Sequence, residues 1–139
     1  MRKQSIVLAF VLLFVPLGAA FAQQCLHGPG ETPEQTARRR AALTAARTVN
    51  NIQYNRPGSR DNVFLSHDDL ASAPFAKGMG PSTNGISLDP QSEIVPGWKL
   101  TLNVTSNGYW FMVKDTTDQC GFAYISNQEG VIFSAEPLR

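Results

Sequence analysis

The chain has 139 residues, with 12 lysines and arginines against 11 aspartates and glutamates, so its formal net charge is +1. Nothing in this balance favours nucleic acid as a partner, because domains that bind nucleic acid usually carry a clear basic excess. We therefore expect no nucleic-acid partner.

Residues 1–22 have the pattern of a secretory signal peptide. A basic start precedes an apolar stretch from Ile6, and Ala20-Phe21-Ala22 matches an A-x-A cleavage site. Cleavage after Ala22 would leave 139 − 22 = 117 residues, enough for one domain over residues 23–139. We expect a periplasmic or secreted protein with no membrane span; the alternatives are an uncleaved anchor and lipid attachment at Cys25.

The mature chain keeps two cysteines, Cys25 and Cys120. An even cysteine count in an exported chain predicts one disulfide. The loop that this bridge closes spans about 95 residues, for which chain-entropy arguments give roughly 4–5 kcal/mol of stabilisation. The alternative is two free thiols.

Residues 33–55 are predicted to form a long helix. Thr32 suits the N-cap, Pro33 suits the first helical position, and Gln35 completes a capping box. Small apolar residues recur at three- and four-residue spacing, which predicts a close-packed stripe made of Ala42, Ala45, Val49 and Ile52, widened by Ala41, Leu43 and Ala46. Arg38-Arg39-Arg40 is interpreted as a solvated group, with an anionic partner surface as the alternative.

Residues 57–97 are rich in Gly, Pro, Ser, Asn and Asp, and they predict a long irregular segment. Within it, Asn62–Leu65 could form a short strand, and Ser66 could cap one helical turn. We expect the segment to lie over the core, held by Phe64, Leu65, Leu70, Phe75 and Ile86.

Residues 98–136 predict an antiparallel β-meander. "WKLTLNVT" alternates strictly between apolar and polar residues, and Asn107-Gly108 is a strong signal for a hairpin turn. The expected cross-strand pairs are Val104 with Phe111, Leu102 with Val113, Thr105 with Trp110, Asn103 with Met112 and Thr101 with Lys114. "GFAYISN" and "VIFSAE" continue the meander. The predicted fold is α+β, with one long N-terminal helix packed on three or four antiparallel strands.

The hairpin places Trp110 and Met112 on the opposite side from Phe111 and Val113. Two interpretations of this mixed face stay open. Either the 57–97 segment folds over it, with Phe75 or Met79 supplying contacts, or the face is exposed and binds a partner.

Few residues point to catalysis or metal binding. Ser66-His67-Asp68 contains three triad residue types, but sequence neighbours do not converge on one reacting atom, so we expect no enzyme. Asp115 and Asp118 lie in a turn and are weak candidates for Ca²⁺ ligands; a solvated turn is the alternative. No zinc spacing, phosphate loop or nucleotide fingerprint is present in the sequence.

The order of elements resembles the globular part of type IV pilins and type II secretion pseudopilins. "ARRRAALTAARTVNNIQYN" looks like the exposed half of the pilin helix, "NVFLSHDDLA" like the loop after it, and residues 97–138 like the last strands. The chain lacks the prepilin cleavage motif and the apolar shaft helix of the family, and Gly28-Pro29-Gly30 separates the leader from the helix. Because some major pseudopilins bind calcium in a C-terminal loop, the resemblance adds weight to Asp115 and Asp118.

The resemblance implies a pilin-like headpiece exported without its shaft. Its expected function is non-enzymatic binding of a protein partner in the cell envelope, such as a filament or secretion component. The alternative is an independent periplasmic or secreted binding module that shares only the fold.

Overall fold

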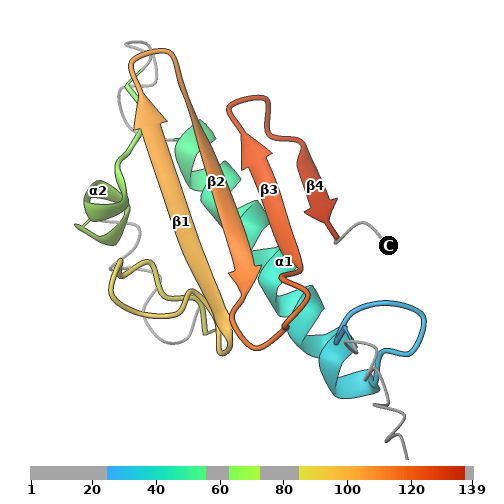
Figure 1. Ribbon diagram of the computed structural model, residues 1–139. Helices are drawn as coiled ribbons and strands as arrows, with labels where there is room; N and C mark the ends of the chain where they lie inside the picture. Colours follow the sequence, from blue (N-terminus) through green and yellow to red (C-terminus); the bar gives the residue numbers. More distant parts are fainter. Residues whose placement is uncertain (1–24, 56–62, 73–84, 137–139) are drawn as a thin grey trace, which may run out of the picture.

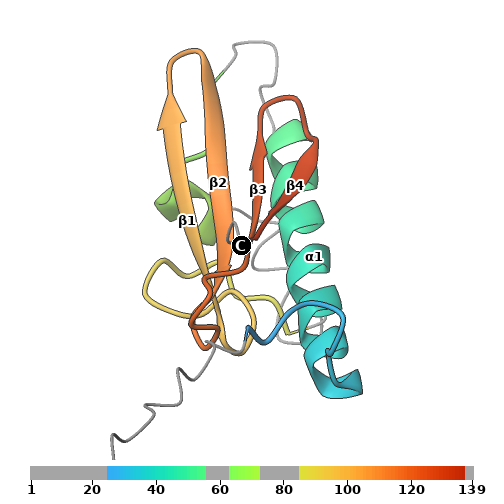
Figure 2. The same cartoon turned by 45° about the vertical axis from the view of Figure 1, so that its right-hand side comes forward.

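The computed structural model describes residues 25–55, 63–72 and 85–136, which form an α+β fold of two layers. Figures 1 and 2 show helix α1 lying along one face of a four-stranded sheet. Residues 1–22, and with them the predicted signal peptide, lie outside the described part of the chain. Among the described residues, no helix is both long and apolar enough to cross a membrane.

Helix α1 (Pro33–Tyr54) begins where the capping residues predict. The Gln35 backbone N–H donates to Thr32 Oγ1 at 3.2 Å, and the Thr32 N–H donates to Gln35 Oε1 at 2.8 Å, so the capping box is confirmed. The helix buries one face against the sheet, and this face consists of Ala42, Ala45, Ala46, Val49, Asn50, Ile52 and Gln53. Ala41, expected at the edge of the stripe, is exposed instead, because it lies on the solvent side of the helix.

The sheet is an antiparallel meander in the order β1-β2-β3-β4. Its strands are β1 (Trp98–Thr105), β2 (Gly108–Asp115), β3 (Ala123–Asn127) and β4 (Ile132–Ala135). The coarse architecture predicted from the sequence, an α+β fold with a helix packed on an antiparallel meander, is therefore confirmed.

The predicted register of the β1–β2 hairpin is wrong by two residues. Thr105 pairs with Gly108, so Leu102 lies opposite Phe111 and the turn consists of Ser106 and Asn107. Gly108 begins β2 without a positive φ angle, and Gln128 lies where a β-carbon on Gly108 would project. Gly108 thus lies in the strand and close to the end of the Gln128 side chain, whereas the prediction assigned it to the turn. A two-residue shift keeps every side chain on its predicted face.

Apolar side chains of the sheet's inner face pack against α1. Trp98, Phe111 and Val113 are fully buried there, and they belong to one apolar cluster with the buried alanines of the helix. The short helix α2 (His67–Ser72) adds Leu70 to the same cluster. The described parts of the predicted irregular segment thus lie over the inner face, and Leu70 packs into the core as expected.

Residues 63–65 form no strand, contrary to the expectation for Asn62–Leu65; Asn62 itself is outside the described residues. The buried Gln53 side chain hydrogen-bonds the backbone of Leu65 in both directions, at 2.7 and 2.9 Å. A glutamine amide thereby satisfies the Leu65 backbone groups that a neighbouring strand would otherwise pair. Ser66 does cap α2, because the Asp69 N–H donates to Ser66 Oγ at 3.2 Å.

Candidate functional site

The sheet's outer face, which points away from α1, presents a row of apolar side chains. Trp110 and Met112 of β2 lie on this face, as the alternation predicts. The register places Met112 beside Ile125 of β3, and Ile125 beside Phe133 of β4. Trp110 is 44% exposed and Phe133 is 58% exposed, while Met112 is half-buried among its neighbours. We call Trp110, Met112, Ile125 and Phe133 the outer apolar patch.

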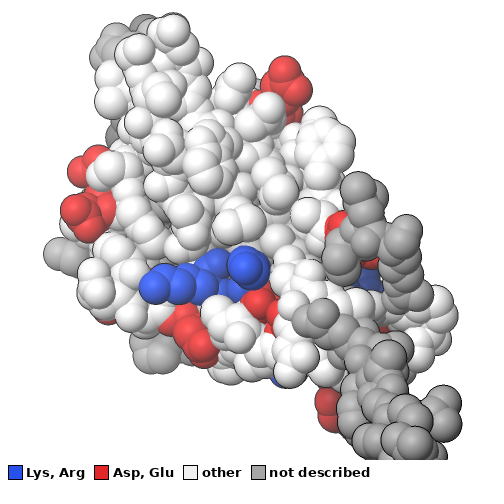
Figure 3. Space-filling view, viewed as in Figure 1, with Lys and Arg blue, Asp and Glu red and all other residues white. Residues whose placement is uncertain are grey.

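Positive charge borders the outer apolar patch. Lys99 of β1 lies directly opposite Lys114 of β2, and both side chains are exposed. Figure 3 shows the part of this face above a basic band as largely uncharged, with acidic side chains directly below the band and at the edges of the face. The face thus combines clustered aromatic and aliphatic side chains with a basic border, and aromatic residues and methionine are enriched at protein interfaces.

The described parts of residues 57–97 do not cover the outer apolar patch. Phe64 packs on Tyr109, an inner-face residue, with ring centroids 5.1 Å apart, and Leu70 is buried on the same side. Phe75 and Met79, the residues suggested as a cover, lie outside the described residues. Trp110 is therefore exposed with respect to all of the structure that is described.

The disulfide between Cys25 and Cys120 is confirmed, and it ties the segment before α1 to the end of the sheet. The Cα atoms are 5.3 Å apart. The Leu26 N–H also donates to Asp118 Oδ1 at 3.1 Å, so the segment is held by a hydrogen bond next to the bridge. A disulfide of this kind is more typical of exported proteins than of cytosolic ones.

A buried histidine, His27, joins the same segment to the sheet. Its Nδ1 lies 2.7 Å from Glu31 Oε1, and its Nε2 lies 2.9 Å from Asp115 Oδ2. Both contacts are hydrogen bonds at once only when the ring has a proton on each nitrogen, because carboxylates accept. The sequence analysis attached no role to His27; the predicted disulfide was the available signal, because it brings residues next to Cys25 close to those before Cys120.

The sequence analysis interpreted Arg38-Arg39-Arg40 as a solvated group, but two of these arginines also bond to other side chains. Arg39 donates to both carboxylate oxygens of Glu31, at 2.7 and 2.9 Å, and Arg38 donates to Thr117 Oγ1 at 3.0 Å. The hydrogen bond from Arg39 is the main cause that lowers the pKa of Glu31 from 4.5 to about 2. Glu31 immediately precedes the N-cap Thr32, so its carboxylate lies beside the first turns of α1. Arg40 alone of the three is exposed as expected.

Asp115 and Asp118 are both buried, and they organise the β2–β3 turn. Asp115 Oδ1 accepts from the N–H groups of Thr117 and Asp118, and Asp118 accepts from the N–H groups of Cys120 and Phe122. Burial opposes ionisation of Asp115, but hydrogen bonds from His27 and Thr117 outweigh it and lower the Asp115 pKa. These carboxylate oxygens, which were weak candidates for Ca²⁺ ligands, thus accept hydrogen bonds from protein donors. The described residues include no cluster of three or more His, Cys, Asp or Glu that could hold a metal.

Ser66, His67 and Asp68 do not form a catalytic arrangement in the structure. The Ser66 hydroxyl donates to Asp69 Oδ2 at 2.6 Å, and His67 Nε2 is buried without a partner among the described residues. Desolvation lowers the pKa of His67. The Ser66 hydroxyl therefore serves the helix cap and is not oriented by the neighbouring imidazole.

Ile125 and Phe133 are the site residues that sequence reasoning did not single out. The usable signal was the two-residue period of the strands predicted at "GFAYISN" and "VIFSAE". Alternate side chains of a strand lie on the same face, so the outer-face positions could have been assigned within each strand. Which strands lie next to Met112 depends on the tertiary register, and only this register turns scattered apolar residues into one row.

Comparisons of the chain with models of protein families, with curated proteins and with solved structures found no match.

Proposed function

We propose that this chain is an exported, non-enzymatic, pilin-like protein that binds a protein partner of the cell envelope through the outer apolar patch. The partner class is a filament or secretion component. The observation that carries the proposal is the exposure of Trp110 and Phe133 on a sheet face where no described element packs. Such a contiguous apolar face is typical of a protein-interaction site.

The scaffold supports this role. The patch is presented by paired strands, and the disulfide and the His27 contacts hold the N-terminal segment against the opposite end of the sheet. Binding to a surface that is already ordered loses less conformational entropy than binding that must order a loop. The alternative function, an independent periplasmic or secreted binding module, would use the same face for a different ligand.

Trp110→Ala tests the proposal. We expect this variant to capture much less partner from a crosslinked envelope fraction, with a melting temperature close to that of the parent protein, because the removed ring is half-exposed. Tyr54→Ala is the matched control, since Tyr54 is 82% exposed at the far end of α1. The measurement combines affinity capture, identification of the captured proteins by mass spectrometry, and thermal unfolding.

Three results separate the alternatives. Capture of filament or secretion components that depends on Trp110 supports the proposal. Trp110-dependent capture of an unrelated ligand supports the independent binding module. Equal capture by the parent protein and Trp110→Ala, or a large fall in melting temperature, would exclude the outer apolar patch as an open binding surface.

A further inference from the structure

Strand β4 is an edge of the sheet on which no other described element packs. It pairs with β3 on one side only, and Figure 1 shows no described element beyond it. Natural edge strands usually carry charges or proline, which discourage pairing with another chain. Ile132–Ala135 carries neither, whereas β1 at the other edge includes Lys99. The backbone groups of β4 that point away from β3 therefore have no strand partner within the described part of the chain.

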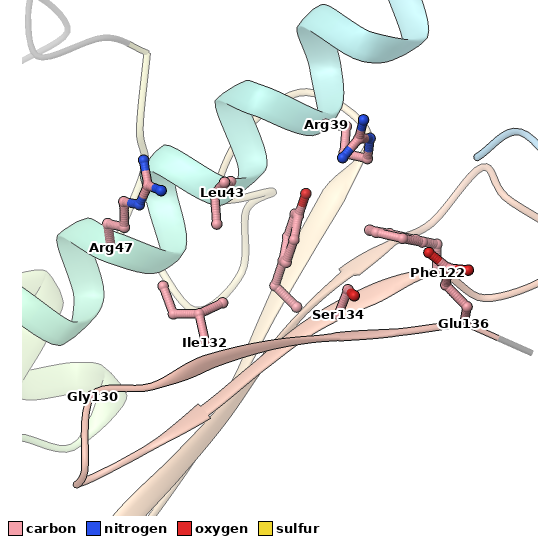
Figure 4. Close-up of a pocket in the computed structure, with 9 residues that line it drawn as sticks. Arg39, Leu43, Arg47, Phe122, Gly130, Ile132, Ser134 and Glu136 are labelled. Carbon is pink, nitrogen blue, oxygen red and sulfur yellow. The ribbon is translucent and has the colours of Figure 1, made fainter. Parts of the chain in front are cut away.

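A groove of about 540 Å³ runs between α1 and β4. One wall consists of Arg39, Leu43 and Arg47, which recur every four residues along a single helix face. The other wall includes Ile132 and Ser134 of β4 and Glu136 just after it, at the two-residue spacing of one strand face. Figure 4 shows the helix side chains facing the strand across this space.

The two ends of the groove carry opposite charges. Figure 4 shows Arg47 toward the Gly130 end and Arg39 toward the Glu136 end. Arg39 is already paired with Glu31. Within the described residues, neither Arg47 nor Glu136 has an ion pair or a side-chain hydrogen bond. The groove thus offers one unpaired cation at one end and one unpaired carboxylate at the other.

We propose that a second copy of this chain occupies this edge, with its β4 adding antiparallel to β4 and Ser134 facing Ser134 about a two-fold axis. This register places Glu136 of the second copy opposite Ile132, at the end of the groove where Arg47 lies. The symmetry repeats the contact, so each Arg47 gains a carboxylate and each Glu136 gains a guanidinium. A two-fold interface of this type uses one self-complementary surface on both copies.

The sheet itself favours this register. With Ser134 facing Ser134, the inner faces of both copies lie on the same side, and the four strands of each copy form one sheet of 4 + 4 strands. Phe133 then lies diagonal to Phe133 of the second copy, about 7–8 Å away between Cα atoms. The outer apolar patch thereby continues from one copy into the other.

Charge reversal tests the interface in the exported chain. We expect the parent protein to form dimers in sedimentation equilibrium, and Arg47→Glu or Glu136→Arg alone to weaken self-association by about tenfold or more, because each homodimer then brings like charges together. An equimolar mixture of the two variants should regain dimers, because the mixed pair places opposite charges at both contacts. Arg40→Glu and Glu129→Arg are the matched controls, since both residues are exposed and line no wall of this groove.

The outcomes are decisive in both directions. A parent protein that stays monomeric up to its solubility limit, single variants that dimerise like the parent, or a mixture that fails to dimerise would each overturn the proposal. Circular dichroism of each variant establishes that the fold is intact. Trp110→Ala should leave self-association within about twofold of the parent value, so failure of this interface and failure of partner capture are separate results.

Discussion

Glu31 shows how one side chain connects the segment before α1 to the helix itself. It accepts hydrogen bonds from Arg39 and Thr36 and lies against His27, while Arg39 is also placed near Tyr124 of β3. Three structural units, namely the N-terminal segment, α1 and β3, therefore meet around one carboxylate. The lowered pKa of Glu31 means that the folded state favours the ionised carboxylate.

Glu31 should make stability depend on acid pH. Its pKa is lowered to about 2 in the folded protein from an ordinary value of 4.5, so its contribution is complete above the ordinary pKa and is lost as the pH falls toward 2. We expect Glu31→Gln to lower the free energy of unfolding near neutral pH and to match the parent protein near pH 2. Urea unfolding at several pH values measures this difference.

The control for this prediction is Glu129→Gln, which removes an exposed carboxylate that has no ion pair among the described residues. A difference between Glu31→Gln and the parent protein that stays constant from neutral pH to pH 2 would contradict the role assigned to ionised Glu31.

At the level of elements, a buried polar network fixes α1 on the sheet. Asn50 of α1 accepts from the Tyr109 hydroxyl at 2.9 Å, and it donates to Ser126 Oγ at 2.9 Å and to the Gly130 carbonyl at 3.1 Å. The Ser126 hydroxyl in turn donates to the Val131 carbonyl at 2.7 Å. The network thus joins the helix to β2, to β3 and to the turn that leads into β4, so it also positions the proposed dimer edge.

Asn50→Leu should destabilise the protein by about 2–3 kcal/mol, because it leaves buried hydroxyl and carbonyl groups without partners. Asn51→Leu is the matched control: Asn51 is the next residue of the helix but is exposed, so its effect should stay within about 0.5 kcal/mol. Chemical unfolding of both variants gives the comparison. Equal stability of Asn50→Leu and the parent protein would show that the network does not hold α1 in place.

At the scale of the whole molecule, the prediction of export and the disulfide are connected, because disulfides are typical of exported proteins. The bridge joins Cys25 to Cys120 across nearly the whole described chain, so its formation constrains helix and sheet together. Disulfide bridges are more typical of proteins in oxidising compartments than of cytosolic proteins. This agrees with the export signal predicted from residues 1–22.

The intact mass of the exported protein, measured without reductant, checks this prediction. We expect a mass that begins at Gln23 and is lower by two hydrogens than the sum for reduced cysteines. Reduction and alkylation of the same sample provide the control, since alkylation should then modify both cysteines. A mass that retains the apolar leader would instead indicate a chain held in the membrane.

Sequence patterns predict the caps and strand faces because these depend on neighbouring residues, and two cysteines in one chain leave a single possible pairing. The Thr32 capping box, the limits of α1, the alternation of the strands and the disulfide partners follow from composition and short spacing. Even the wrong hairpin register preserved the outer face of Trp110 and Met112, because a two-residue shift does not change the side of a strand.

Contacts between separate segments became visible only in the folded chain. His27 between Glu31 and Asp115, Gln53 on the Leu65 backbone, and the row from Met112 through Ile125 to Phe133 each join segments far apart in the chain. Such contacts depend on the exact strand register and on which helix and loop residues face the sheet, and the sequence patterns predicted the meander but not these details. The candidate site therefore appeared in the sequence as two residues, and the fold extended it to a surface across three strands.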